Sequence, residues 1–284
     1  MEWPYQPNAG VRSFFKSQCG QDAFLDCTVF NETAGGVYLD IGCNDGTSNS
    51  NTFFYAKTMN WYGRCVEADP NKFQQIKSRA QRNDGIHGAV SNRMGTSTFQ
   101  VVNVPDGGLS GLADTLDDRA KVISHARQMQ VPTLTARHLL ETYYASETTI
   151  DYVSLDVEGH ELEVMRAWPF DARWCVSVFT IENNHWCNAS RGILPELQLI
   201  LGRQYAHHRS IGPDEVFVRR QRCKRDAVSA RDHRPSRKYC DQPAFLSHRR
   251  APDPFSELSC VACVACMACM ACVLGAVSFH SLGD

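Results

Sequence analysis

Acidic and glycine residues stand at the ends of two short apolar runs near the start of this sequence. Asp40, Gly42 and Gly46 follow the first run, and Glu67 ends the second run, 25 positions beyond Gly42. A glycine-containing loop lets a ligand approach the backbone at a helix N-terminus. An acidic side chain at the end of the next strand can accept hydrogen bonds from two ribose hydroxyls. The spacing favours a nucleoside-containing ligand, while the alternative that both carboxylates only cap helices stays open.

A second group of polar residues follows the apolar run 150–155. Asp156, Glu158 and His160 are the candidate catalytic residues, because carboxylates and imidazole can take up a proton. We expect Asp156 to orient a ligand and His160 to remove a proton, since the ordinary pKa of histidine lies near neutrality. The structural alternative is that Glu158 only interacts with a helix dipole and that His160 only fills the first helical turn.

Glu182 and Asn183 follow a further apolar run, 175–181. We expect them to bind hydroxyl groups of a substrate, with loop stabilisation as the alternative. Glu182 and the preceding group together offer the ligand types of a metal site, but spacing alone does not establish one, and we predict no metal. The sequence also lacks a dinucleotide GxGxxG pattern, because Asn44 occupies the second glycine position, and no P-loop Lys-Ser/Thr pair follows.

Strand and helix patterns alternate along the first three quarters of the chain. Apolar runs that end in turn residues predict buried strands of a parallel sheet, and right-handed crossovers should connect them. The chemistry should then lie at the carboxyl ends of these strands. The strands are expected at 36–42, 63–70, 86–90, 150–156 and 175–181, with helices beginning near 52, 71 and 157, and a closing hairpin formed by 204–210 and 215–218.

Five sequence blocks occur in the order and spacing of FkbM-type S-adenosylmethionine-dependent methyltransferases, and the resemblance covers residues 13–220. The block SLDVEGHE at 154–161 is the most discriminating. The others are SQCGQD at 17–22, YLDIGCNDGTSN at 38–49, VEADP at 66–70 and IENN at 181–184.

This resemblance implies an α/β, Rossmann-like class I methyltransferase fold, with a seven-stranded mostly parallel sheet and a C-terminal antiparallel hairpin. It also implies that the chain binds S-adenosyl-L-methionine and methylates a hydroxyl oxygen of a sugar or other small metabolite. By the same resemblance, the methionine part of the cofactor should contact the loop after the first strand, Glu67 should bind the ribose, and the adenine should be flanked by Ala89 and Ser91. The loop residues concerned are Asp40, Gly42, Asn44 and Gly46.

Two other functions remain to be weighed. A catalytically inactive binding or trafficking module would keep the cofactor pocket without turnover, because a fold does not imply a function. An NAD-dependent oxidoreductase is disfavoured by the missing glycine pattern. The expected partner is a small hydroxylated acceptor or a glycan. Nucleic acid is not expected, because the basic stretch 219–250, with 11 Lys and Arg against 3 acidic residues, carries no stacking aromatics or binding motif.

The C-terminal part differs in composition from the rest of the chain. We expect an N-terminal extension over 1–12, the methyltransferase domain over 13–220, a basic disordered linker over 221–258, and a low-complexity Cys/Ala tail over 259–284. The tail contains 20 uncharged residues, long enough for a membrane anchor. Such an anchor, which would make the protein membrane-associated, and a metal-binding tract are the alternatives for it.

Cysteine usage favours a reducing compartment on sequence grounds. Five of the 13 cysteines lie in the triplet repeat of the tail, and the others show no zinc-type pairing. No secretory leader pattern is evident at the start of the chain. We therefore expect reduced thiols and a cytoplasmic location.

Overall fold

The computed structural model describes residues 14–78, 82–102, 109–116, 126–171, 173–186, 188 and 190–223. These residues belong to one compact unit, Pro7–Cys240. The expectations for the N-terminal extension, for most of the basic linker and for the Cys/Ala tail lie outside the described residues.

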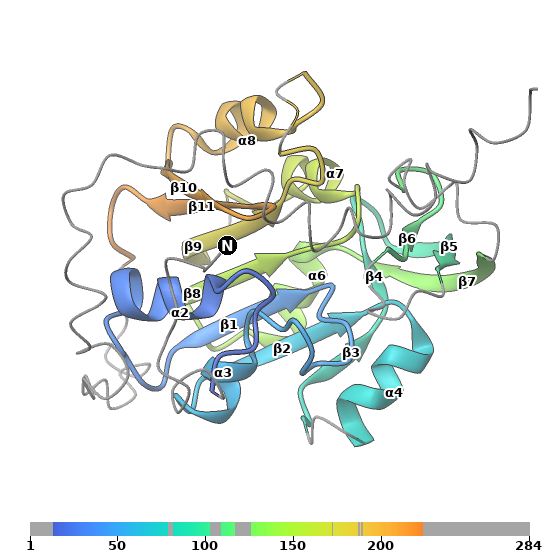
Figure 1. The fold of residues 1–284 in the computed structure, drawn as a ribbon, viewed down its shortest axis with the longest axis horizontal. Helices are drawn as coiled ribbons and strands as arrows, with labels where there is room; N and C mark the ends of the chain where they lie inside the picture. Colours follow the sequence, from blue (N-terminus) through green and yellow to red (C-terminus); the bar gives the residue numbers. More distant parts are fainter. Residues whose placement is uncertain are drawn as a thin grey trace, which may run out of the picture. The chain divides into compact units, whose positions relative to one another are not determined.

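A seven-stranded sheet forms the centre of the molecule (Figure 1). Its strand order is β10-β11-β9-β8-β1-β2-β3, and the five strands from β9 to β3 pair in parallel. The last two strands form an antiparallel hairpin, of which β11 also pairs antiparallel with β9. This is the predicted Rossmann-like α/β fold. The strands are β1 Val37–Ile41, β2 Tyr62–Glu67, β3 Gly85–His87, β8 Thr149–Leu155, β9 Cys175–Glu182, β10 Tyr205–Ile211 and β11 Asp214–Arg219.

Both faces of the sheet are covered, which is why its central strands are mainly apolar. All residues of β1 and β8 are buried. Leu39 belongs to the core cluster that includes side chains of α6, α7 and α8, whereas its neighbour Tyr38 packs with α2 and α3 on the other face. This alternation follows from the two-residue period of a strand. The helices are α2 Gln21–Leu25, the π-helix η1 Asp26–Phe30, α3 Phe53–Lys57, α4 Pro70–Ser78, α6 Ala136–Tyr143, α7 Glu161–Arg166 and α8 Leu194–Leu201.

A second, four-stranded sheet was not predicted. Its order is β4-β7-β5-β6, and its strands are β4 Ala89–Val90, β5 Gly95–Val101, β6 Gly111–Leu112 and β7 Arg127–Leu134. The single strand expected at 86–90 divides at Gly88 between the two sheets. A Cβ atom on Gly111 would lie 3.2 Å from the carbonyl oxygen of Glu158, so the small sheet packs against the loop that follows β8 (Figure 1).

Two disulfides join pairs of cysteines that both belong to the described residues, and the expectation of reduced thiols is wrong for these cysteines. Cys43, in the loop after β1, is bonded to Cys65 of β2, with their Cα atoms 5.8 Å apart. Cys175, at the start of β9, is bonded to Cys223 beyond β11, with a Cα separation of 5.6 Å. Both pairings join segments that the sheet brings together, which the spacing of cysteines in the sequence does not reveal.

None of the helices in the described part of the chain has the length and apolar character that a membrane span requires.

Candidate functional site

The loop after β1 and the end of β2 meet at the carboxyl edge of the sheet. Because β1 and β2 are parallel neighbours, Glu67 comes to lie beside the loop. Its Oε2 accepts a hydrogen bond from the backbone N–H of Asn44 at 2.9 Å, and its Oε1 accepts one from the N–H of Asp69 at 2.7 Å. Burial raises the pKa of Glu67 to about 8, against the lowering effect of these donors. The structure thus brings together the loop after β1 and Glu67, two features that the sequence singled out.

The loop itself depends on residues with left-handed backbone. Gly42, Asn44 and Gly46 have φ angles of 85°, 53° and 78°, a region in which glycine and asparagine are tolerated best. At Gly42 the constraint is also steric, because a Cβ atom would lie 1.6 Å from the carbonyl oxygen of Asp156. Gly42 therefore allows the loops after β1 and β8 to touch.

Asp40 lies beneath this loop in a buried polar network. Its Oδ2 accepts a hydrogen bond from the Thr52 hydroxyl at 2.6 Å. The guanidinium of Arg82 donates to the same hydroxyl at 3.3 Å, to the carbonyl oxygen of Gly46 at 3.2 Å, and to Asp84 at 2.9 Å. Burial acts to raise the pKa of Asp84, but the hydrogen bond and charge of Arg82 hold it below the ordinary value.

Arg82 is a site residue that the sequence did not single out. Its side chain is only 1 % exposed, although it belongs to the polar segment 81–84, where a charged residue would ordinarily be solvated. Only the tertiary fold shows that Arg82 holds residues 42–46 through the Gly46 carbonyl. We call this segment, which is expected from the sequence to bind the cofactor, the cofactor loop.

Asn51 offers a further polar atom at this edge. Its side-chain Nδ2 donates to Ser154 Oγ at 3.0 Å, whereas its Oδ1 has no partner within the described part of the chain although the residue is only 8 % exposed. A buried amide oxygen without a donor is costly. Its position is suited to a ligand that brings an N–H group to this edge of the sheet.

Ala89 and Ser91 follow the strand next to β2 and are both buried. The Ser91 hydroxyl lies 3.0 Å from Nε2 of His160, and the Thr115 hydroxyl lies 2.8 Å from Nδ1 of the same ring. Burial lowers the pKa of His160. Both ring nitrogens are therefore engaged, and His160 links the small sheet to the start of α7.

A cluster of three carboxylates lies at the ends of β8 and β9. Asp156, Glu158 and Glu182 each place an oxygen within 4.8 Å of the others. Burial raises the pKa of Asp156 to about 6. Burial, followed by the charges of Asp156 and Glu158, also raises the pKa of Glu182 well above its ordinary value. We call these three residues the acidic cluster.

The two asparagines after β9 have different surroundings. Asn183 donates to Glu215 at 2.9 Å and accepts from the backbone N–H of Ile193 at 3.1 Å, so its amide holds the turn after β9. Asn184, which the sequence did not single out, donates to Glu158 at 3.3 Å. Its position one residue further along the same polar segment was the only signal for it in the sequence.

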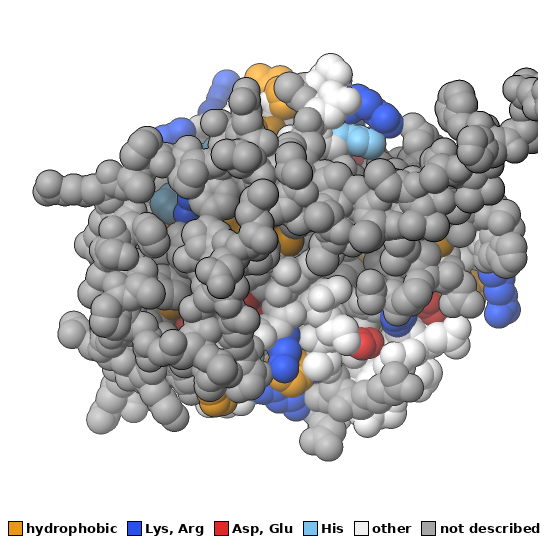
Figure 2. Space-filling model, viewed as in Figure 1, with side chains coloured by type: hydrophobic (Ala, Val, Ile, Leu, Met, Phe, Trp, Pro, Cys, Tyr) orange, Lys and Arg blue, Asp and Glu red, His pale blue; other side chains and the backbone are white. Residues whose placement is uncertain are grey.

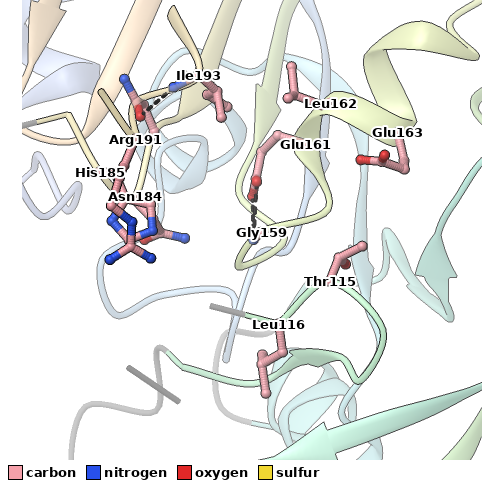
Figure 3. A pocket seen from close by; sticks show the side chains of 11 residues that line it. Thr115, Leu116, Gly159, Glu161, Leu162, Glu163, Asn184, His185, Arg191 and Ile193 are labelled. Carbon is pink, nitrogen blue, oxygen red and sulfur yellow. Dashed lines mark hydrogen bonds between the residues drawn. The ribbon is translucent and has the colours of Figure 1, made fainter. Parts of the chain in front are cut away.

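A cavity of about 220 Å³ opens beside the acidic cluster. Figure 3 shows Asn184, His185 and Arg191 on one side of it, with Thr115 and Leu116 on the other. In Figure 2, histidine and basic side chains lie next to each other at the top of the molecule, in the region of α8. The remaining lining residues are Gly159, Glu161, Leu162, Glu163, Asn183 and Ile193.

Comparison with known proteins identifies the family. Residues 40–209 match the methyltransferase FkbM domain, and this match covers more than half of the chain. The chain therefore belongs to the FkbM methyltransferase domain family.

Among solved structures, the chain is similar to the crystal structure of methyltransferase FkbM from Methylobacillus flagellatus KT. The two chains share 12 % sequence identity with a TM-score of 0.38, and the alignment covers 65 % of this chain and 43 % of that one. The chain thus spans less than half the length of that protein. No curated protein sequence matches the chain.

Proposed function

We propose that this chain is an S-adenosyl-L-methionine-dependent methyltransferase that methylates a hydroxyl oxygen of a sugar or other small metabolite. The observation that carries the proposal is the position of Glu67, whose carboxylate meets the cofactor loop at the Asn44 backbone N–H. A carboxylate in this position, at the carboxyl ends of adjacent parallel strands, suits the two ribose hydroxyls of a nucleoside.

The residues present fit the cofactor in two further respects. The buried Asn51 Oδ1, to which no described residue donates a hydrogen bond, can accept one from the ammonium group of a methionine moiety. Ala89 is a small buried residue beyond β3, the neighbour of β2, and we expect it to flank the adenine together with Ser91. When bound, S-adenosylmethionine supplies an electrophilic methyl group on its sulfonium.

The chain must then orient the acceptor and take up its proton. During transfer the S–CH₃ bond breaks, the O–CH₃ bond forms, and the hydroxyl proton leaves. The acidic cluster is the better candidate for proton uptake than His160, because the ring nitrogens of His160 already bond to the hydroxyls of Ser91 and Thr115. The adjoining cavity, with Asn184 and Arg191 on its wall, is suited to a polar hydroxylated acceptor or the end of a glycan.

We infer an oxidising compartment as the place of action. Disulfides persist in secreted and lumenal proteins and are rare in the cytosol. The bonds of Cys43 with Cys65 and of Cys175 with Cys223 therefore argue against the cytoplasmic location expected from the sequence.

The proposal is tested by measuring release of S-adenosylhomocysteine in the presence of a panel of monosaccharides, glycans and small hydroxylated metabolites. We expect release that depends on the acceptor, with a product heavier by one methylene. Tight binding of S-adenosylmethionine without turnover on any acceptor would instead favour the binding or trafficking module. Absence of cofactor binding in calorimetry would overturn both.

A further inference from the structure

The acidic cluster brings three carboxyl groups close together at one edge of the sheet. Glu158 and Glu182 are 8 % and 7 % exposed, and with Asp156 they place three carboxylate oxygens within 4.8 Å of one another. Bringing like charges together in a buried site is unfavourable unless protons or a cation compensate them.

Glu182 supplies the second, independent observation. Its Oε2 is buried and has no hydrogen-bond partner among the described residues, although Glu182 ends β9 in the middle of this edge of the sheet. Because Glu182 also belongs to the acidic cluster, this unpartnered oxygen is available as a ligand for a cation.

We propose that Asp156, Glu158 and Glu182 bind one divalent metal ion. Three carboxylates are hard oxygen ligands, which suit Mg²⁺, Mn²⁺ or Ca²⁺ rather than zinc or copper. Two oxygens on one ion at distances of about 2.0–2.6 Å can be separated by no more than about 4–5 Å. The observed 4.8 Å limit fits a Ca²⁺ ion directly and fits the smaller ions after a small contraction.

The ion gives the neighbouring cavity a chemical role, and this step rests on the proposed function. Asn184, which lines the cavity, donates to Glu158 of the cluster at 3.3 Å, so the two sites are adjacent. A metal ion that coordinates the acceptor hydroxyl would lower the pKa of that hydroxyl and fix its oxygen for methyl transfer. Each ligating carboxylate has a second oxygen that can accept the departing proton.

Metal binding is tested on the full-length, disulfide-bonded protein by the loss of the free Mn²⁺ electron paramagnetic resonance signal. We expect one strong site per chain, for which Mg²⁺ or Ca²⁺ competes, and an affinity at least tenfold weaker in Glu182→Gln. The matched control is Glu141→Gln, which removes the same charge from an exposed position of α6 and should bind Mn²⁺ as the unmodified protein does. Equal affinity in Glu182→Gln, or no binding by the unmodified protein, would overturn the proposal.

A second measurement covers the case in which Glu182→Gln does not fold. Mn²⁺ should raise the melting temperature of the unmodified protein, and it should do so less in Glu158→Gln, which keeps the Glu182 carboxylate. An equal or absent rise in both proteins counts against the site.

A failure of the metal proposal can be distinguished from a failure of the proposed methyltransferase function. Calorimetry with S-adenosylmethionine in the presence of EDTA reports cofactor binding without the metal. If the metal binds and no acceptor is methylated, the metal site stands and the methyltransferase proposal fails. If methylation proceeds at full rate in EDTA, the metal has no part in the reaction.

Discussion

The carboxylate of Glu67 accepts a hydrogen bond from the backbone N–H of Asn44 at 2.9 Å, and this bond joins the end of β2 to the loop after β1. The two residues are 23 positions apart in the chain, and they meet because β1 and β2 are adjacent parallel strands. The cofactor loop and the carboxylate that is expected to bind the ribose are therefore one structural unit, and changes to either should alter cofactor affinity.

Replacement of Glu67 by alanine should weaken S-adenosylmethionine binding at least tenfold. Hydrogen bonds to a charged group contribute about 1.5–3 kcal/mol each, and a tenfold change corresponds to about 1.4 kcal/mol. Isothermal titration calorimetry measures the effect, with Glu141→Gln on exposed α6 as the control. Unchanged affinity would show that Glu67 does not contact the cofactor.

Replacement of Arg82 by methionine should destabilise the fold by about 3–5 kcal/mol, the usual cost of leaving a buried charge without its partner. Arg82 Nη2 lies 2.9 Å from Asp84 with the arginine side chain 1 % exposed. In the control, Arg137→Met removes a pair with Asp171 whose side chains are 47 % and 82 % exposed, and it should cost less than about 1 kcal/mol. Urea unfolding distinguishes the two, and equal losses would contradict the assigned role of Arg82.

His160→Gln should retain turnover with an unchanged pH profile, because glutamine can still bond to the hydroxyl of Ser91 or Thr115. We expect a lower melting temperature from the lost hydrogen bond. In the same assay, Asp156→Asn should reduce turnover at least about a hundredfold. A comparable loss in His160→Gln, with a displaced pH profile, would return the role of base to the histidine.

Removal of the Cys43–Cys65 disulfide by a double serine substitution should lower both stability and cofactor affinity. The bond spans 22 positions, for which chain entropy predicts a loss of about 3 kcal/mol, and Cys43 belongs to the cofactor loop. Removal of Cys175–Cys223, at the opposite end of the sheet, should lower stability only. Denaturation measures the stability of each variant, and calorimetry measures its affinity for the cofactor. Equal cofactor affinity in both variants would show that the Cys43–Cys65 disulfide does not affect the site.

Stability should fall as the pH rises from about 4 to 8, in part because of Asp214. Burial raises the pKa of this carboxyl from its ordinary value of 3.8 to about 8 in the folded chain. Between these two pKa values the folded state holds a proton that the unfolded state has lost. Each such proton contributes a slope of up to about 1.4 kcal/mol per pH unit. Asp214→Asn, which can still accept the hydrogen bond from Gln21, should show a shallower decline in urea unfolding at pH 5.5, 6.5 and 7.5. Parallel curves would indicate that Asp214 does not carry this proton.

The strands of the large sheet could be predicted because their signal is local. Apolar residues predominate in β1 and β8, every position of these strands is buried, and each strand is followed by turn or polar residues. Parallel pairing then places the ends of neighbouring strands at one edge, so Glu67, Asp156 and Glu182 could be expected at the same edge of the sheet.

The small sheet and the partners of single side chains depended on tertiary structure. Strands β5 and β7 are polar and half exposed, and they pair across 32 positions at Thr98 and Gln130, so no short window of sequence reveals them. Short windows of sequence also do not reveal the hydrogen bonds of His160, the buried position of Arg82 or the two disulfides described above. A local pattern reports the burial of consecutive residues, whereas the partner of a given atom depends on how distant segments pack, and that packing decided the chemistry of this site.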